Sequence, residues 1–250
     1  SKMLNFHKEK KAKATIAVIE VPWDEAPRFG IMNAKEDGKI YEFEEKPENP
    51  KSNLASMGVY IFNWSTLRDY FIKSEDSNKC FDDFGKNIIP MMLEDQAEMY
   101  AYSFKGYWRD VGTIQSLWDA NMDLIKYPDA IDLNDSRWRI YTNTMASPPQ
   151  YIGKDADISE ALIADGCSIL GDVENSVLSH GVYVDENSTV KDSVIMPNVK
   201  IGKNVTIEKA MIGEGAIIED NAIIRNNEDE INVVSEYEIV KPQQVLQGGK

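Results

Sequence analysis

Two short segments in the first half of the sequence place charged or small residues at points where strands are interrupted. Residues 44–47 read Glu-Glu-Lys-Pro, and because proline stops a strand, the side chains of Glu45 and Lys46 are expected to project at a strand end. A lysine offers a phosphate a point charge and three donors, whereas a glutamate accepts hydrogen bonds from vicinal hydroxyls. In residues 54–60, Gly58 lets a ligand approach the backbone closely and Ser56 offers a hydroxyl.

A third segment, residues 107–113, reads Tyr-Trp-Arg-Asp-Val-Gly-Thr and joins a strand to the start of a helix. An aspartate at such a junction is able to hold Mg²⁺, and this position belongs to Asp110. Thr113 is expected to cap the helix. Residues 44–47 taken alone are a weak signal, because a charged strand end is usually just solvated. The other two segments have ordinary structural explanations as well.

Alternating strands and helices in residues 1–126 are expected to position these segments. The turn residues 36–39, Glu-Asp-Gly-Lys, predict a hairpin, and the continuous apolar runs 14–21 and 54–62 predict buried strands. The expected strands are 14–21, 29–34, 40–45, 54–62 and 99–104, and the expected helices are 1–12, 65–72, 83–93 and 113–125. This order predicts an α/β fold with a mixed sheet covered on both faces.

The second half of the sequence is a repeat. Residues 127–150 contain three prolines and little periodicity, which predicts a linker, and residues 175–191, 192–208 and 209–225 then superimpose without gaps. A shorter unit, 160–174, precedes them. Within the units an aliphatic residue recurs every six positions: Leu178, Val184, Val190, Ile195, Ile201, Ile207, Ile212, Ile218 and Ile224. Four positions after each of the first two aliphatic residues of a unit comes a small or β-branched residue: Val182, Ser188, Val199, Val205, Ala216 and Ala222.

This six-residue step predicts a left-handed parallel β-helix over residues 151–240, followed by a C-terminal tail, 241–250. Each short side of a triangular coil supplies one large inward residue and a smaller one near the corner. Stacked coils then bury one another's aliphatic ladder. The alternative, an antiparallel sandwich, requires a period of two rather than six.

Composition restricts the possible partners. The sequence has 42 acidic against 27 basic residues, a formal charge of −15, and no concentrated basic patch, which argues against nucleic acid and membrane surfaces as partners. Two cysteines and two histidines in no metal-like spacing argue against zinc and favour a reducing cytoplasm. No run approaches the roughly 20 apolar residues of a membrane span. We therefore expect a soluble, cytoplasmic protein.

The repeat contains few reactive groups. His180 at a coil corner is a candidate general base for acyl transfer, but a single corner histidine is more often a solvated turn residue. An acyl-CoA also favours basic surroundings, whereas residues 127–250 contain 10 basic against 21 acidic residues. Cys167 occupies a small inward position, where we expect it to fill the core.

Taken together, in this order and ahead of hexapeptide repeats, these segments resemble the sugar nucleotidyltransferases, and most closely the bacterial glucose-1-phosphate adenylyltransferase family. The resemblance spans residues 1–225. The segments that carry it are Arg28-Phe29-Gly30-Ile31-Met32, Phe43-Glu44-Glu45-Lys46-Pro47, Leu54-Ala55-Ser56-Met57-Gly58, Asp83-Phe84-Gly85 and Trp108-Arg109-Asp110-Val111-Gly112-Thr113.

The resemblance implies roles for five residues. Gly30 would contact the sugar phosphate through its backbone, Glu45 would bind glucose hydroxyls, and Ser56 would touch the sugar. Lys46 would hold the phosphate of glucose 1-phosphate, and Asp110 would ligate the catalytic Mg²⁺. The reaction implied for the family joins ATP and glucose 1-phosphate to ADP-glucose and pyrophosphate in glycogen synthesis. Allosteric homo-oligomers, commonly tetramers, are also implied.

One part of the family pattern is absent from this sequence. The family's ATP site depends on a Gly-rich loop followed by Arg and Leu, and on a further Asp, and neither occurs here. We therefore expect residues 1–126 to be the C-terminal, sugar-phosphate-binding part of the catalytic domain, and the chain alone to be inactive or nearly so. A non-catalytic regulatory subunit of the same family is an alternative, and other sugars or nucleotides remain open.

Overall fold

The computed structural model describes residues 2–76, 83–133, 135–136, 139–142, 146–225 and 230–242. The chain divides into two compact units, Ser1–Gly106 (unit 1) and Tyr107–Lys250 (unit 2). Among the described residues, no helix combines the length and the apolar character that crossing a bilayer requires.

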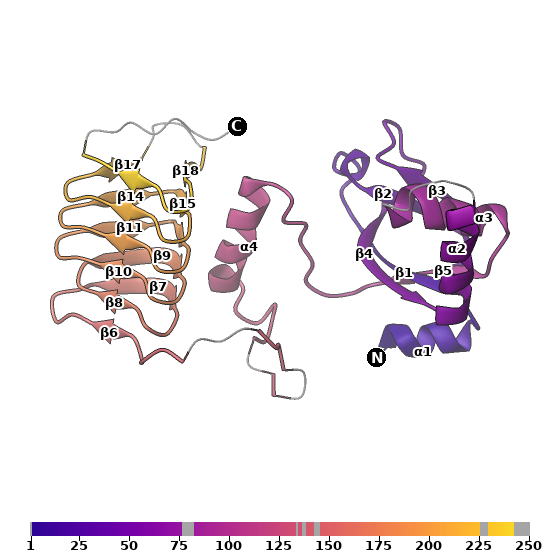
Figure 1. Cartoon of the computed structure of the whole chain (residues 1–250), viewed down its shortest axis with the longest axis horizontal. Helices are drawn as coiled ribbons and strands as arrows, with labels where there is room; N and C mark the ends of the chain where they lie inside the picture. The colour runs from indigo at the N-terminus through magenta and orange to yellow at the C-terminus, as the bar shows by residue number, and fades with distance from the viewer. Residues whose placement is uncertain are drawn as a thin grey trace. The chain divides into compact units, whose positions relative to one another are not determined.

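Unit 1 is built on one five-stranded sheet (Figure 1). Its strands are β1 (Ala14–Glu20), β2 (Gly30–Ala34), β3 (Ile40–Glu45), β4 (Leu54–Phe62) and β5 (Met99–Ser103). They lie in the order β3-β2-β4-β1-β5, with β1 and β5 parallel and the other pairs antiparallel. The predicted mixed sheet is therefore confirmed, including the hairpin between β2 and β3.

Helices cover the sheet of unit 1 on both faces. They are α1 (Lys2–Glu9), the short turn η1 (Ala26–Arg28), α2 (Trp64–Asp76), and a continuous helical run made of η2 (Phe84–Ile88) and α3 (Ile89–Glu94). Ile16 and Val18 of β1 pack with Ile89 and Met92 in one buried cluster. Thr15 points to the opposite face, where its hydroxyl lies 2.8 Å from Nδ1 of His7 in α1.

Strand β4 is more exposed than its apolar sequence predicted. Of its residues, Ala55 alone is buried, and the side chain of Val59 is half exposed. The register of β4 against β1 shifts between Ile16 and Val18, and Gly58 opposite this bulge has a φ of 71°. The expectation of a buried strand at 54–62 was wrong in this respect, because an apolar run does not specify whether neighbouring elements cover it.

The sheet of unit 1 also curls until its two outer strands meet. Lys39, next to β3, forms an antiparallel bridge with Tyr100 of β5, and the Ala101 N–H donates to the Gly38 carbonyl at 2.8 Å. Gly38 has a φ of 85°, and a Cβ there would lie 3.2 Å from the Ala101 carbonyl oxygen. A hydrogen bond of 2.7 Å from Lys39 Nζ to Glu98 adds to this closure and raises the pKa of the lysine.

Unit 2 contains a parallel β-helix, and Figure 1 shows its coils stacked from β6 to β17. Its strands are β6 (Tyr151–Ile152), β7 (Ile158–Ile163), β8 (Ser168–Ile169), β9 (Asp172–Leu178), β10 (Tyr183–Val184), β11 (Thr189–Lys191), β12 (Val194–Ile195), β13 (Lys200–Ile201), β14 (Thr206–Glu208), β15 (Ala210–Ile212), β16 (Ile217–Ile218), β17 (Ile223–Ile224), β18 (Asn232–Val234) and β19 (Ile239–Val240). Val184 pairs with Ile201 and Ile201 with Ile218, so the register follows the predicted repeat.

The predicted inward ladder is confirmed residue by residue. The nine aliphatic residues named from the sequence are each at most 1% exposed, and the six smaller partners are equally buried. Cys167 is 2% exposed and its thiol donates to the Ser179 carbonyl at 3.0 Å, while burial raises its pKa, which agrees with a core filler. Asn187, Asn204 and Asn221 turn successive corners with φ between 56° and 64°.

Helix α4 (Ile114–Lys126) packs on the β-helix rather than in unit 1. Thr113 caps it as predicted, accepting a hydrogen bond of 3.1 Å from the Ser116 N–H. Met122 is buried in a cluster with Val194, Met211 and Ile231. The β-helix therefore covers the apolar face of this helix, which the order of elements in the sequence had placed with the α/β sheet. The described residues between α4 and β6 form neither helix nor strand, as expected for a linker.

Candidate functional site

The structure brings three of the predicted sugar-site residues into one row across unit 1. Gly30 opens β2 and pairs with Glu45, the last residue of β3. Ile31 pairs with Ala55 of β4, so the next positions along these antiparallel strands are Gly30 and Ser56. Residues that lie opposite each other on neighbouring strands present their side chains to the same face. We call these three residues the Glu45–Gly30–Ser56 row.

Lys46 lies directly beyond this row. Its φ of 47° is left-handed, a conformation that costs a non-glycine residue about 1–2 kcal/mol. The Lys46 N–H donates to the Phe29 carbonyl at 3.1 Å, which ties the turn to the residue before β2. The lysine side chain is exposed, as expected for a group that meets a ligand from solvent.

Gly85, in the helical run, lies next to Glu45 of the same row. A Cβ placed on Gly85 would lie 3.3 Å from Glu45 Oε2 and 3.2 Å from Asp83 Oδ1. Asp83 caps the run by accepting hydrogen bonds from the N–H groups of Gly85 (2.7 Å) and Lys86 (3.2 Å). The sequence marked residues 83–85 only through the family resemblance, because no local pattern predicts which strand end a helix terminus will face.

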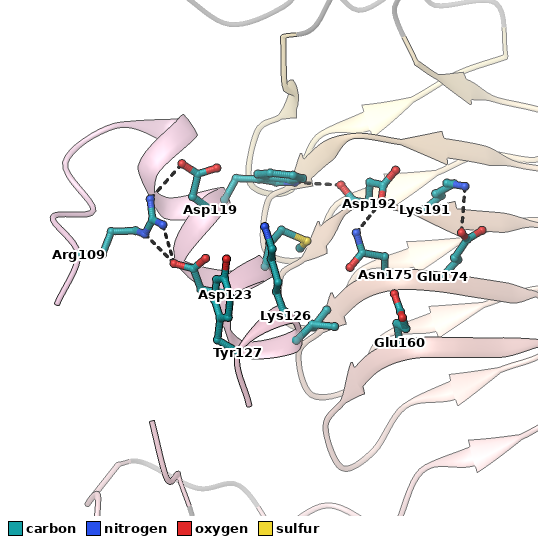
Figure 2. Close-up of a pocket in the computed structure, with 13 residues that line it drawn as sticks. Arg109, Asp119, Asp123, Lys126, Tyr127, Glu160, Glu174, Asn175, Lys191 and Asp192 are labelled. Carbon is teal, nitrogen blue, oxygen red and sulfur yellow. Dashed lines mark hydrogen bonds and ion pairs between the residues drawn. The ribbon is translucent and has the colours of Figure 1, made fainter. Parts of the chain in front are cut away.

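Asp110 belongs to unit 2, where its neighbour Arg109 is firmly held (Figure 2). Arg109 lies 2.8 Å (Nε) and 2.6 Å (Nη2) from Asp123 Oδ2, and Nη1 lies 3.2 Å from Asp119. The Tyr107 hydroxyl donates to the same Asp123 oxygen at 3.0 Å. Burial and this hydrogen bond raise the pKa of Tyr107, which keeps the phenol protonated as a donor.

Asp110 is the residue that the sequence predicts as a Mg²⁺ ligand. Within the described ranges, no three or more His, Cys, Asp or Glu side chains gather as a cation site. Asp110 is a partly buried carboxylate, and a Cβ on Gly112 would lie 3.2 Å from its Oδ2. A single carboxylate suits Mg²⁺ that binds mainly through water and substrate phosphates, and does not form a cage for a resident ion. Asp110 therefore fits Mg²⁺ only as a shared ligand.

Helix α4 and the corners of the β-helix enclose a groove of about 1000 Å³, drawn in Figure 2. Two polar pairs line its β-helix side: Lys191 Nζ lies 3.0 Å from Glu174, and Asn175 donates to Asp192 at 2.6 Å. The Trp118 indole N–H donates to the Asp192 carbonyl at 2.9 Å and fastens the helix to the coil. This hydrogen bond and the apolar cluster around Met122 hold α4 on the β-helix, and the segment that carries Asp110 directly precedes that helix.

His180, the candidate base for acyl transfer, lies partly buried at its corner. Its carbonyl accepts a hydrogen bond from the Asn198 N–H at 3.0 Å. Among the described side chains, none forms a hydrogen bond with its ring, so no carboxylate of those residues orients the imidazole as a base. The acyltransferase alternative gains no support from the geometry.

The mixed sheet with its covering helices and the hexapeptide-repeat β-helix each match the model of a known protein family. The family model of nucleotidyl transferases matches residues 1–127, and the chain belongs to that family. A second model, described as a GlmU-like, C-terminal hexapeptide, matches residues 149–240.

Relatives of the chain agree with the resemblance seen in the sequence. The chain is 70% identical over 251 residues to a glucose-1-phosphate adenylyltransferase of Clostridioides difficile (strain 630), an alignment that covers 100% of this chain and 65% of that protein. Proteins of the same name from Desulforamulus reducens and Acetivibrio thermocellus are 59% and 56% identical over 203 residues, 81% of this chain and 51% and 48% of theirs. The chain therefore spans less than two thirds of each of these relatives.

Proposed function

We propose that this chain is the glucose-1-phosphate-binding part, together with the β-helix, of a glucose-1-phosphate adenylyltransferase. The Glu45–Gly30–Ser56 row with Lys46 at its end is the observation that carries the proposal. The row offers a carboxylate and a hydroxyl to a sugar, and the lysine offers a cation to its phosphate.

The reaction places the phosphate oxygen of glucose 1-phosphate against the α-phosphorus of ATP and releases pyrophosphate. Catalysis of this kind depends on alignment and charge neutralisation, with no covalent enzyme intermediate. Lys46 holds the sugar phosphate, and Glu45 orients the glucose ring. Asp110 shares in binding Mg²⁺, which neutralises phosphate charge when bound.

The ATP-binding Gly-rich loop of the family does not occur in these 250 residues. The chain by itself is therefore proposed to bind glucose 1-phosphate without turning it over. In the whole protein we propose a cytoplasmic homo-oligomer, a tetramer as in the family, subject to an allosteric effector.

The first experiment titrates glucose 1-phosphate into the chain by calorimetry and follows pyrophosphate release with ATP and Mg²⁺. Lys46→Ala is expected to weaken binding by about tenfold to a hundredfold, the value of one charge-assisted hydrogen-bonding partner. Lys73→Ala serves as the control, because Lys73 is an exposed lysine that pairs instead with Asp95 at 2.9 Å.

Equal affinities of the wild-type and Lys46→Ala chains would overturn the proposed sugar site. Pyrophosphate release well above that of Lys46→Ala would show that the chain holds ATP, and would contradict the proposal that it is inactive alone.

A further inference from the structure

We propose that Gly85 is a specificity-determining residue of the sugar site, because its missing side chain leaves the space that the Glu45 carboxylate occupies. This inference rests on the proposed function, in which Glu45 accepts hydrogen bonds from sugar hydroxyls. Gly85 acts through Glu45 and is a positioning residue rather than a ligand.

Two glycines from distant parts of the sequence border the same two side chains. A Cβ on Gly30 would lie 3.0 Å from Glu45 Oε2 and 2.7 Å from Cε2 of Phe43. A Cβ on Gly85 would lie 3.3 Å from both Glu45 Oε2 and Cζ of Phe43. The carboxylate therefore lies in a slot between the start of β2 and the first turn of the helical run.

The backbone conformation does not require a glycine at position 30 or at position 85. Gly30 lies in a strand and Gly85 in a helical segment, and neither has a φ in the left-handed region. Inside a helix, glycine is less favourable than alanine. Local structure therefore favours alanine at position 85, and what glycine provides there is room.

The helical run cannot easily retreat from a side chain added at position 85. Its first turn is held by the two hydrogen bonds to Asp83 and by a 3.0 Å hydrogen bond from the Asn87 N–H to the Asp83 carbonyl. Ile88 and Ile89 behind it are 2% and 0% exposed. Asp83 Oδ1 would lie 3.2 Å from the same Cβ, but it is held in place as the cap. Glu45, in contrast, is an exposed strand end, so its carboxylate is the group that is freer to move.

A displacement of a few tenths of an ångström at Glu45 alters hydrogen bonds to hydroxyls but leaves phosphate binding by Lys46 in place. The two residues therefore control different quantities. Lys46 sets the affinity for any sugar 1-phosphate, whereas the Glu45 slot sets the preference for one sugar over its epimers.

The test titrates glucose 1-phosphate, galactose 1-phosphate and mannose 1-phosphate into the chain by calorimetry. Gly85→Ala is expected to weaken glucose 1-phosphate by about threefold to tenfold, because a shift of a few tenths of an ångström weakens a hydrogen bond without removing it, with little effect on the epimers. Lys46→Ala is expected to weaken all three ligands together and to leave their ratios unchanged.

The outcomes separate the two proposals. If Lys46→Ala leaves the binding of glucose 1-phosphate unchanged, the proposed function fails. If Lys46→Ala weakens binding but Gly85→Ala retains the wild-type preference, this inference alone fails.

A second variant distinguishes a loss of sugar preference from a folding defect. Glu45→Asp changes an exposed residue and withdraws the carboxylate by one methylene, so it is expected to lower the preference without lowering the thermal unfolding midpoint. Once the carboxylate is withdrawn, Gly85→Ala has little left to displace, and the double variant should match Glu45→Asp alone. Fully additive losses of preference would overturn the inference.

Discussion

Ile201→Ala is expected to lower the free energy of unfolding of unit 2 by about 3–4 kcal/mol, the cost of a cavity that a stacked core cannot close. Ile201 is fully buried, and its strand lies between those of Val184 and Ile218. Each coil of a solenoid contacts only its neighbours, so the deletion removes packing from the coils on both sides.

Circular dichroism during urea unfolding measures this loss. Lys200→Ala is the matched control, because Lys200 precedes Ile201 in β13 and its side chain is exposed. The control is expected to change stability by less than about 0.5 kcal/mol. Similar losses for both variants would contradict a core built on the six-residue ladder.

Asp123→Ala is expected to destabilise the attachment of residues 107–113 to α4 by about 2–3 kcal/mol, because it leaves partly buried donors without their acceptor. The Asp123 residue is 9% exposed, and its Oδ2 receives hydrogen bonds from Arg109 and Tyr107. The expected effect is faster amide hydrogen exchange across residues 107–126.

Asp119→Ala is the control for this prediction. Asp119 meets the same guanidinium at 3.2 Å, but its side chain is 32% exposed, so we expect less than about 1 kcal/mol. Because Arg109 directly precedes Asp110, loss of Asp123 is also expected to loosen the proposed Mg²⁺ ligand. Equal exchange in the Asp123→Ala and Asp119→Ala chains would refute this role of Asp123.

The β-helix was predictable from the sequence nearly to the residue. Every inward position named from the six-residue period is buried, including Ser188 and Ala216. A solenoid makes this possible because each coil meets almost the same environment above and below, so one local pattern decides burial throughout the stack.

The hairpin and the charged strand end could also be predicted from the local sequence. Pro47 limits the strand before it, and the turn at Gly38 joins β2 to β3, so the positions of Glu45 and Lys46 follow from neighbours in the sequence. Their assignment to a sugar phosphate depended on the family resemblance, since a charged strand end is not specific.

The tertiary structure alone decided three features: the exposure of β4, the docking of α4 on the β-helix, and the seating of the Glu45 carboxylate against Gly85. Periodicity shows that a helix has an apolar face, but the partner of that face depends on contacts between distant residues. Local patterns in this chain were enough to predict the main helices and strands and the repeat side chains that point inward. Which surfaces those elements cover was decided by packing, because burial depends on neighbours that a local pattern does not contain.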